Sequence, residues 1–163
     1  MLKVNNLYKS YKTGNMNYDV LKNISFYVKK GEFVAVMGPS GSGKTTLLNC
    51  ISCFVPFEKG EILLSGENIS GLNEESLADI RNQKLGFVFQ DFMLLDGLSV
   101  VENICLPQII ADKDVTKMEV LANKLCNTFG ISHIKDKYPA EISGGEKQRS
   151  AVARALINKP YIF

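Results

Sequence analysis

The chain has 163 residues, 45% of them hydrophobic, which suffices for one domain with a buried core. Nineteen basic and seventeen acidic residues leave a formal charge of +2, so the composition lacks the strongly basic character typical of nucleic-acid binding. The N-terminus has no basic region followed by an apolar run, and no apolar stretch is long enough to span a bilayer. We therefore expect a cytosolic protein with reduced thiols and no nucleic-acid partner.

Alternation and apolar runs predict the strands. Residues 21–30 (LKNISFYVKK) alternate between apolar and polar, which predicts a half-buried antiparallel strand. Residues 33–38 (FVAVMG) are continuously apolar, as expected of a strand covered on both faces. Residues 61–66 and 85–90 are further strand candidates, and the apolar residues 161–163 predict the start of another.

Helical periodicity predicts three helices. The first follows Gly43, the second covers the region of Met118 to Phe129, and the third runs from about residue 145 to 157, where Pro160 is placed to stop it. Their apolar stripes are Leu47, Leu48, Ile51 and Val55 in the first and Met118, Leu121, Ala122, Leu125 and Phe129 in the second. Residues 91–158 contain almost no strand pattern, which indicates a mostly helical subdomain inserted into an α/β core.

The four cysteines do not have metal-site spacing. Cys50 and Cys53 form a CxxC, but no second pair accompanies it, and both lie in an apolar helical pattern. We interpret them, with Cys105 and Cys126, as small core residues; a zinc or redox site is the alternative.

Residues 38–45 (GPSGSGKT) match the phosphate-binding pattern G-x-x-x-x-G-K-[ST] between an apolar run and a helix. Glycines allow the backbone to turn its N–H groups toward phosphate oxygens, and the helix start adds a positive dipole end. Lys44 supplies a charge to the β- and γ-phosphates and Thr45 a hydroxyl ligand for Mg²⁺. The predicted nucleotide-binding residues here are Gly38, Pro39, Ser40, Gly41, Ser42, Gly43, Lys44, Thr45 and Thr46. The alternative is a glycine-rich turn with an exposed lysine.

A second candidate anion site lies at residues 141–149 (EISGGEKQR). Ser143, Gly144 and Gly145 precede an alanine-rich helical run, so they place a hydroxyl and backbone N–H groups at a helix start. The alternative is an ordinary serine N-cap. A phosphate-binding loop alone leaves GTPases, nucleotide kinases, helicases and transporter motors open, and this second stretch narrows the choice.

With both stretches the sequence resembles the ATP-binding subunits of ABC transporters, whose signature is LSGGQ. Ile142 and Glu146 depart from that signature, and the Ser-Gly-Gly centre is intact. The resemblance covers the whole chain and implies an α/β P-loop NTPase (ABC ATPase) core with an antiparallel β subdomain and an inserted helical subdomain. It divides 1–163 into a core part (1–90), the helical subdomain with the signature helix (91–158) and the start of a further strand (159–163).

The resemblance also implies roles for single residues. Gln90 ends a strand and would contact Mg²⁺ and the attacking water, so Lys44 and Gln90 are the implied catalytic residues and Thr45 and Gln90 the metal ligands. Tyr11 would stack on adenine. The implied cofactors are ATP and Mg²⁺. His133 precedes the signature, whereas the histidine of the family follows it, so we interpret His133 as a surface residue of the subdomain.

Implied partners are a second ATPase subunit and a membrane permease. Two subunits would pair head-to-tail, with ATP on one P-loop meeting Ser143, Gly144 and Gly145 of the other. The opening segment and residues 86–107 are similar to the subgroup that serves FtsX-like permeases, and most of all to the bacitracin-resistance (Bce-type) subunits. A patch at Phe92, Met93, Leu94 and Leu95 is a candidate docking surface, with packing inside the subdomain as the alternative.

The expected function is therefore ATP-driven export or detoxification of a peptide antibiotic or similar amphiphile, on the inner face of the cell membrane. Cell division and lipoprotein release are the alternatives within the family. In the family an Asp-Glu pair follows the strand that begins after Pro160, so we expect these residues beyond Phe163, a C-terminally incomplete domain, and nucleotide binding without hydrolysis by the 163 residues alone.

Two other classes fit less well. A soluble ABC ATPase of the DNA-repair type would carry a long insertion between the P-loop and the signature, and the spacing leaves no room for one. A P-loop phosphotransferase would need an arginine-bearing lid, and the Ser-Gly-Gly stretch argues against it.

Overall fold

The structure is a computed structural model that describes residues 1–14 and 16–163, with the side chain of Thr116 left out. The chain forms two compact units, Met1–Ala78 and Asp79–Phe163, and helix α2 (Glu74–Gln83) crosses the division. This division falls earlier than the boundary at 90/91 that the sequence suggests. The reason is that residues 82–86 bond to the C-terminal end of the chain: Asn158 Nδ2 donates to the Asn82 carbonyl at 2.8 Å, and Gly86 N donates to the Ile162 carbonyl at 2.8 Å.

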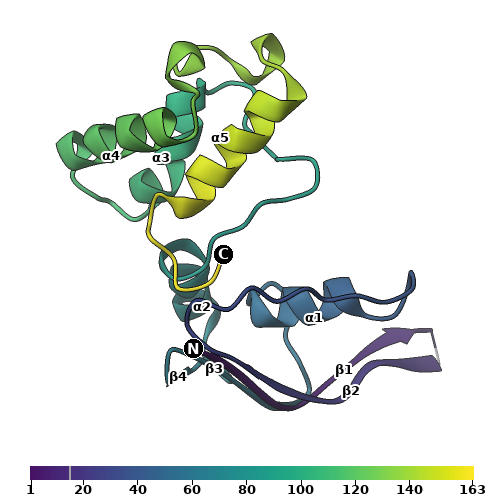
Figure 1. The fold of residues 1–163 in the computed structure, drawn as a ribbon. Helices are drawn as coiled ribbons and strands as arrows, with labels where there is room; N and C mark the ends of the chain where they lie inside the picture. The colour runs from purple at the N-terminus through teal and green to yellow at the C-terminus, as the bar shows by residue number, and fades with distance from the viewer. Residues whose placement is uncertain (15) are drawn as a thin grey trace. The chain divides into compact units, whose positions relative to one another are not determined.

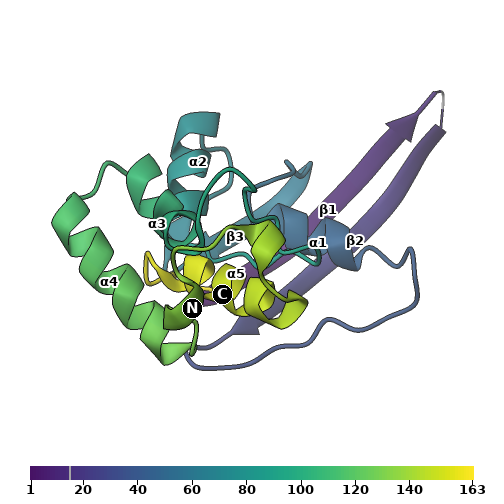
Figure 2. The same cartoon turned by 90° about the horizontal axis from the view of Figure 1, so that it is seen from above.

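An antiparallel sheet forms the frame of the N-terminal unit (Figure 1). Its strands are β1 (Leu2–Thr13), β2 (Met16–Val28), β3 (Lys59–Leu64) and β4 (Glu67–Asn68), in the order β2-β1-β3-β4. β1 and β2 run side by side as a long hairpin (Figure 2). Along β2 the side chains of Ile24, Phe26 and Val28 are half-buried and those of Ser25 and Tyr27 are exposed, which confirms the predicted alternation. β3 confirms the candidate at 61–66.

A bulge in β1 keeps one face of this strand buried along its length. Leu2 and Val4 are buried before the bulge, and Leu7 and Lys9 are buried after it. Asn6, between them, has a left-handed backbone with φ of 47°, which asparagine tolerates better than most residues. The extra residue shifts the pairing register, so that Leu7 returns to the inner face and is fully buried.

The first predicted helix is α1 (Lys44–Ile51), which buries Cys50 and Ile51. Val55 lies beyond its end. The strand predicted at 33–38 is wrong: these residues have no regular structure, make no β-pairing and are all exposed, with Phe33 at 97%. An apolar run forms a buried strand only where neighbouring strands bond to its backbone on both sides. None of the described strands pairs with residues 33–38.

Helices make up most of the C-terminal unit, which confirms the helical subdomain. They are α3 (Val100–Ile110), α4 (Val115–Thr128) and α5 (Gly144–Leu156), with short turns η1 (Ser132–Ile134) and η2 (Pro139–Glu141) between the last two. α3 packs against α4 and α5 (Figure 1). The residues at their contact are fully or nearly fully buried: Val100, Ile104, Met118, Ala122, Cys126, Ile131, Ala153 and Ile157.

The strand predicted at 85–90 forms only at its first residue. Leu85 makes an isolated parallel bridge to Ile162, and residues 86–89 have no regular structure. The same bridge places the predicted strand start at 161–163 beside Leu85. Tyr161 N donates to the Lys84 carbonyl at 2.8 Å, so two segments far apart in sequence begin a parallel pairing at this point.

Among the described residues, no helix has both the length and the apolar character needed to cross a membrane.

Candidate functional site

The phosphate-binding loop leads directly into α1. The amide of Ser42 donates to the Pro39 carbonyl at 3.3 Å, which closes a tight turn, and the helix begins with Leu47 N donating to the Gly43 carbonyl at 2.8 Å. Gly43 is the N-cap and offers no side-chain cap, and α1 has no acidic residue in its first turn. The positive end of the helix is thus not matched by a side chain of the helix itself.

The Lys44 side chain folds back across this loop. Its ammonium donates to the carbonyls of Gly38 at 2.9 Å and Pro39 at 2.7 Å, so the charge lies over the backbone that precedes the helix. The exposed lysine of the alternative interpretation is therefore not observed, since Lys44 is half-buried. A cation and a helix start at the same loop favour a polyanionic ligand.

Glycine is required at two positions of the loop. A Cβ at Gly38 would lie 2.8 Å from Ser42 Oγ, within the space that the loop encloses. A Cβ at Gly43 would lie 3.0 Å from Val20 Cγ1, and the φ of Gly43 is 91°. Glycine at both positions therefore allows the loop to fold tightly and α1 to approach β2 closely. The backbone donors and the Lys44 charge at this loop fit the phosphates of a nucleotide.

The remaining predicted residues of this loop lie around the cradle. Ser40, Gly41, Ser42 and Thr45 are exposed, and Thr46 is half-buried. The Thr45 hydroxyl belongs to the first turn of α1, where it is available as an oxygen ligand for a hard cation such as Mg²⁺.

Tyr11 lies on β1 with its ring 40% exposed. The Lys9 ammonium is 5.1 Å from the centroid of this ring, within cation–π distance. Lys9 is itself buried and donates to Glu58 Oε1 at 2.9 Å, while Ser10 N donates to Glu58 Oε2 at 2.9 Å. Burial raises the pKa of Glu58, but the hydrogen bonds from Lys9 and Ser10 outweigh it and leave that pKa below its ordinary value. The sequence analysis did not identify this Lys9–Glu58 pair, which supports the strand segment that carries Tyr11.

The second helix start, at Ser143, has a different arrangement. The Ser143 hydroxyl and backbone N–H both donate to Glu146 Oε2, at 2.7 and 2.8 Å, and Glu146 N donates back to Ser143 Oγ at 3.4 Å. These hydrogen bonds from the Ser143 side chain and backbone, with His133 beside them, lower the pKa of Glu146 to about 2. The serine N-cap of the alternative interpretation is therefore present, in the form of a complete capping box.

His133 lies on η1 and is exposed, as the sequence analysis expected. The sequence did not predict its contact: His133 Nε2 lies 3.2 Å from Glu146 Oε1. Glu146, one of the two residues that depart from the family signature, thus connects the helix start to the neighbouring turn. The first-turn amides of Gly144 and Gly145, which the capping box does not use, remain donors at this helix start.

Gln90 is exposed, in a turn that follows the irregular segment 86–89. Tyr11 and the P-loop residues belong to the N-terminal unit, and Gln90 and Ser143–Gly145 belong to the C-terminal unit. The proposed metal ligands Thr45 and Gln90 therefore come from different units.

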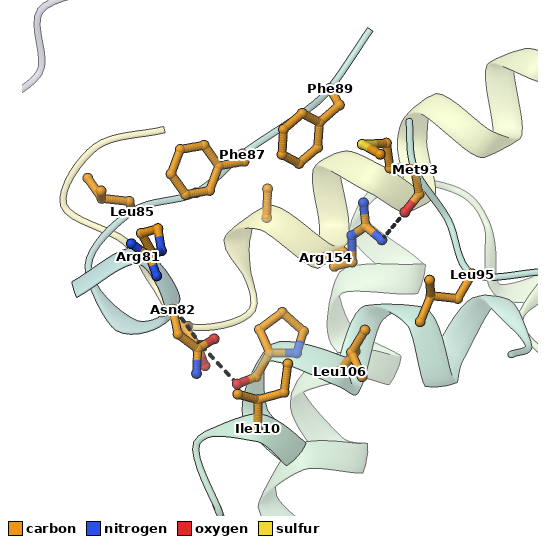
Figure 3. A pocket seen from close by; sticks show the side chains of 14 residues that line it. Arg81, Asn82, Leu85, Phe87, Phe89, Met93, Leu95, Leu106, Ile110 and Arg154 are labelled. Carbon is orange, nitrogen blue, oxygen red and sulfur yellow. Dashed lines mark hydrogen bonds between the residues drawn. The ribbon is translucent and has the colours of Figure 1, made fainter. Parts of the chain in front are cut away.

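A cavity of about 370 Å³ lies in the C-terminal unit beside the loop that follows Gln90 (Figure 3). Its walls are mainly apolar and include Phe87, Phe89, Met93, Leu95, Leu106 and Ile110. Met93 and Leu95 are 59% and 49% exposed, whereas Leu94 is half-buried and packs against the helical core. The proposed four-residue docking patch is thus divided, and only part of it is accessible.

Two polar residues that the sequence analysis did not single out hold this loop. Arg154 on α5 donates to the carbonyls of Met93 and Phe92, and the fully buried Asn103 on α3 accepts from Leu95 N at 2.7 Å. Helical spacing could have indicated Arg154, because it lies three and four residues after the buried Ala151 and Ser150 and so belongs to the inner face of α5.

All four cysteines are buried, which confirms their interpretation as core residues. Burial raises the pKa of the Cys50, Cys105 and Cys126 thiols, that of Cys105 to about 11. These thiols are therefore poor nucleophiles at neutral pH.

The fold and the loop define a P-loop NTPase core of the ABC ATPase type. The ABC transporter family matches residues 21–163, and the chain belongs to this family as an ATP-binding domain. It is 49% identical over its full length to the ABC transporter ATP-binding protein YxdL of Bacillus subtilis (strain 168). It is 46% identical over its full length to the bacitracin export ATP-binding protein BceA of Halalkalibacterium halodurans. The chain spans 63% of the length of YxdL and 64% of the length of BceA.

Further similarities concern a third relative and a solved structure. The chain is 41% identical to the lipoprotein-releasing system ATP-binding protein LolD of Buchnera aphidicola, of which it spans 72%. The dimeric structure of the bacterial ABC transporter cassette MJ0796 superimposes with a TM-score of 0.87 at 38% identity, covering 98% of this chain and 71% of that one. A second structure of that cassette is described as a post-hydrolysis state bound to ADP and Pi.

Proposed function

We propose that the chain is the nucleotide-binding part of an ATPase subunit that drives export or detoxification of a peptide antibiotic or a similar amphiphile. The observation that carries this proposal is the loop at the start of α1, where Lys44 and two obligatory glycines form a cradle for phosphates. The structure of the ABC cassette MJ0796 in a post-hydrolysis state bound to ADP and Pi supports ATP as the nucleotide.

Residue roles follow from chemistry and position. Backbone amides of residues 40–46 would hold the phosphates, with Lys44 as the charge that offsets them. Tyr11 would stack its exposed ring on adenine, supported below by Lys9. Thr45 and Gln90 would supply oxygen ligands to Mg²⁺, and Gln90 would orient the attacking water. When bound, the metal offsets phosphate charge during hydrolysis.

Tyr11 offers a direct test of this arrangement. We expect Tyr11→Ala to weaken ATP binding by about two- to tenfold, the range given by an aromatic stacking interaction. Tyr27→Ala is the matched control, because Tyr27 is also an exposed tyrosine of the sheet, paired with Lys3 at the other end of the hairpin. Equal affinities for both variants would contradict the adenine role of Tyr11.

We also propose that two subunits pair head-to-tail, with Ser143, Gly144 and Gly145 of one subunit facing the nucleotide of the other. The dimeric structure of MJ0796 supports a dimer. In this chain the first-turn amides of Gly144 and Gly145 are the donors that would meet the phosphate, because the Ser143 hydroxyl is engaged by Glu146.

The partner in the membrane would be an FtsX-like permease, which would hold the subunit at the inner face of the cell membrane. The similarity to BceA, named for bacitracin export, supports the antibiotic assignment. The candidate docking surface is the apolar cavity with Met93 and Leu95 at its rim (Figure 3). An apolar groove with exposed hydrophobic residues fits an amphipathic helix of a partner.

The experiment is co-purification of the protein with a permease expressed from the same host. We expect Leu95→Asp to lose the permease while keeping its melting temperature, because Leu95 is about half exposed. Leu94→Asp is the informative comparison: its side chain packs on the helical core, so we expect it to lower stability first. Retention of the permease by a folded Leu95→Asp variant would contradict docking at this cavity.

Lipoprotein release is the second candidate, favoured by the 41% identity to LolD. Cell division is a third role within the same subgroup. Cells that express the protein with its permease distinguish these functions. Export of a peptide antibiotic and resistance to it would favour the first function over lipoprotein release and cell division.

A further inference from the structure

We propose that Arg154 is a positioning residue that ties the signature helix α5 to the loop after Gln90 and holds this loop in a strained conformation. What the loop does rests on the proposed function, since Gln90 precedes it and Met93 and Leu95 of the docking cavity belong to it. That Arg154 holds the loop rests on geometry within the C-terminal unit alone.

The contact is a fork between one side chain and two successive carbonyls. Arg154 Nη1 donates to the Met93 carbonyl at 2.6 Å (Figure 3). Arg154 Nη2 donates to the Phe92 carbonyl at 2.7 Å. The planar guanidinium presents two parallel N–H groups, and lysine cannot reproduce this geometry. The two carbonyls must therefore point the same way for both hydrogen bonds to form.

They point the same way because the backbone is in an unusual conformation. Phe92 and Met93 have φ of 59° and 46°, and two successive non-glycine residues in the left-handed region are costly. Such a conformation persists only where surrounding contacts determine it. The Arg154 fork is a contact of this kind.

Arg154 depends on the loop in turn. Burial lowers the pKa of Arg154, and within the described part of the chain its partners are these two carbonyls and no carboxylate. A partly buried charge without hydrogen bonds is unfavourable. Opening the loop therefore costs the guanidinium its partners, so the loop and the inner face of α5 are stabilised together.

A second anchor limits the movable segment to a few residues. Asn103 on α3 holds the following part of the chain, with Nδ2 donating to the carbonyls of Leu95, Leu98 and Ser99 at 3.0 Å. Residues 95–99 are thus fixed to α3, while residues 92 and 93 are fixed to α5. Any displacement of α5 would act on the chain between Gln90 and Leu95 through Arg154.

The experiment compares Arg154→Met, Arg154→Lys and Arg149→Met by hydrogen exchange, without nucleotide. Phe92 N and Met93 N are bonded to the carbonyls of Phe89 and Asp91, so their exchange reports the closed loop. We expect exchange of residues 91–94 to accelerate about ten- to a hundredfold in Arg154→Met, the range of a lost charged hydrogen bond. Arg154→Lys should keep part of the protection that Arg154→Met loses. Arg149→Met, on the exposed side of α5, should leave exchange at residues 91–94 unchanged.

A double-variant cycle tests the strain itself. Glycine adopts the left-handed conformation at no steric cost, so in a Met93→Gly background the effect of Arg154→Met should be smaller. Unchanged exchange at 91–94 in Arg154→Met would overturn the proposal. Acceleration throughout α3, α4 and α5 with a lowered melting temperature, in both Arg154 variants, would also overturn it, because it would show a merely structural role.

A turnover measurement then connects the loop to the reaction. In the protein with its permease we expect Arg154→Met to lower kcat and leave the KM for ATP unchanged, because Gln90 loses its position while the P-loop is intact. A raised KM at constant kcat would overturn the link. Normal nucleotide affinity in a Lys44→Ala variant would instead contradict the proposed function and leave the exchange result valid.

Discussion

Two helix starts in this chain carry glycine-rich sequences and differ in how their backbone donors are satisfied. α1 begins at Gly43 with no side-chain cap and no acid in its first turn. α5 begins at Ser143 with a capping box in which the Glu146 carboxylate accepts from the Ser143 hydroxyl and amide. At the start of α1 the positive end of the helix dipole can therefore interact with a ligand. At the start of α5 the Glu146 carboxylate partly neutralises the positive end of that helix.

This difference suggests that the two helix starts bind anions with different strength. A helix start without an internal anion, with Lys44 folded over the loop, suits tight binding of a polyanion. A start that already holds a carboxylate suits a weaker contact, such as the one that we propose with the phosphate of a second subunit. The Ser-Gly-Gly sequence alone did not reveal this, because the carboxylate of the capping box belongs to Glu146, one of the two residues that depart from the family signature.

The largest effect should come from Lys44→Ala, which removes the cation from the first helix start. We expect nucleotide affinity to fall about ten- to a hundredfold, because the charge-assisted hydrogen bond from Lys44 to the phosphates is lost, and ATP turnover of the protein with its permease to be abolished. A titration with ATP and Mg²⁺ measures it, with Lys30→Ala, an exposed lysine outside the loop, as control. Wild-type affinity and turnover in Lys44→Ala would contradict the assignment of this loop.

The second effect concerns the other helix start. Gly144→Asp places a carboxylate at the first turn of α5, facing the phosphate that we propose the partner subunit presents. Like charges at a close contact cost several kcal/mol, so we expect ATP-driven dimerisation to be lost while ATP binding by the monomer is kept. Size-exclusion chromatography with ATP decides it, and Gly97→Asp in the same unit is the control, since a Cβ there meets open space. Dimers of normal strength in Gly144→Asp would contradict the head-to-tail arrangement.

Local patterns predicted α1, α4, α5 and two strands, but α2 and α3 were missed. The stripe around Met118 and the alternation at Ile24, Phe26 and Val28 depend on the nearest neighbours in sequence, and the structure confirms them. The stripe around Leu47 is confirmed only in part, because Leu48 is 50% exposed and Val55 lies beyond the end of α1. The strand at 33–38 was wrong, and the strand at 85–90 forms only at Leu85, because pairing depends on distant segments, which periodicity does not encode. β1 was missed as a strand because the bulge at Asn6 interrupts its alternation.

For the candidate site, the sequence identified the residue types at both helix starts. It did not reveal the contacts that these residues make with other segments of their own unit. The Gly43 position against Val20, the His133–Glu146 contact and the Arg154 fork each join segments that no motif connects. The P-loop was predictable because its chemistry is continuous in sequence.

A smaller effect, on stability, is expected from Gly43→Ala. The added Cβ would lie 3.0 Å from Val20 Cγ1, and alanine at a φ of 91° is strained, so we expect the free energy of unfolding to fall by about 1–3 kcal/mol. Gly31→Ala has a similar φ of 82° with open space around it and separates backbone strain from the steric contact. Urea unfolding of both variants measures the difference. Equal losses would show that the contact with β2 contributes nothing to the shape of the first helix start.

The smallest effect is the pH dependence that the internal carboxylate gives to the second helix start. The pKa of Glu146 is lowered to about 2 in the folded chain from an ordinary 4.5, because the Ser143 hydroxyl and amide donate to the ionised form. A lowered folded-state pKa means that the stabilisation is fully present above about pH 4.5 and is lost as the pH falls toward 2. The melting temperature of the wild type should therefore exceed that of Glu146→Gln above pH 5, and the difference should vanish toward pH 2.

Glu102 makes a similar capping box at Ser99, but it is present in both proteins and cancels in the comparison. Glu119→Gln, at an exposed position on α4, serves as control. A difference in melting temperature that stays constant from pH 5 to pH 2 would mean that the Glu146 carboxylate does not neutralise the start of α5. The two helix starts would then not differ in their internal charge.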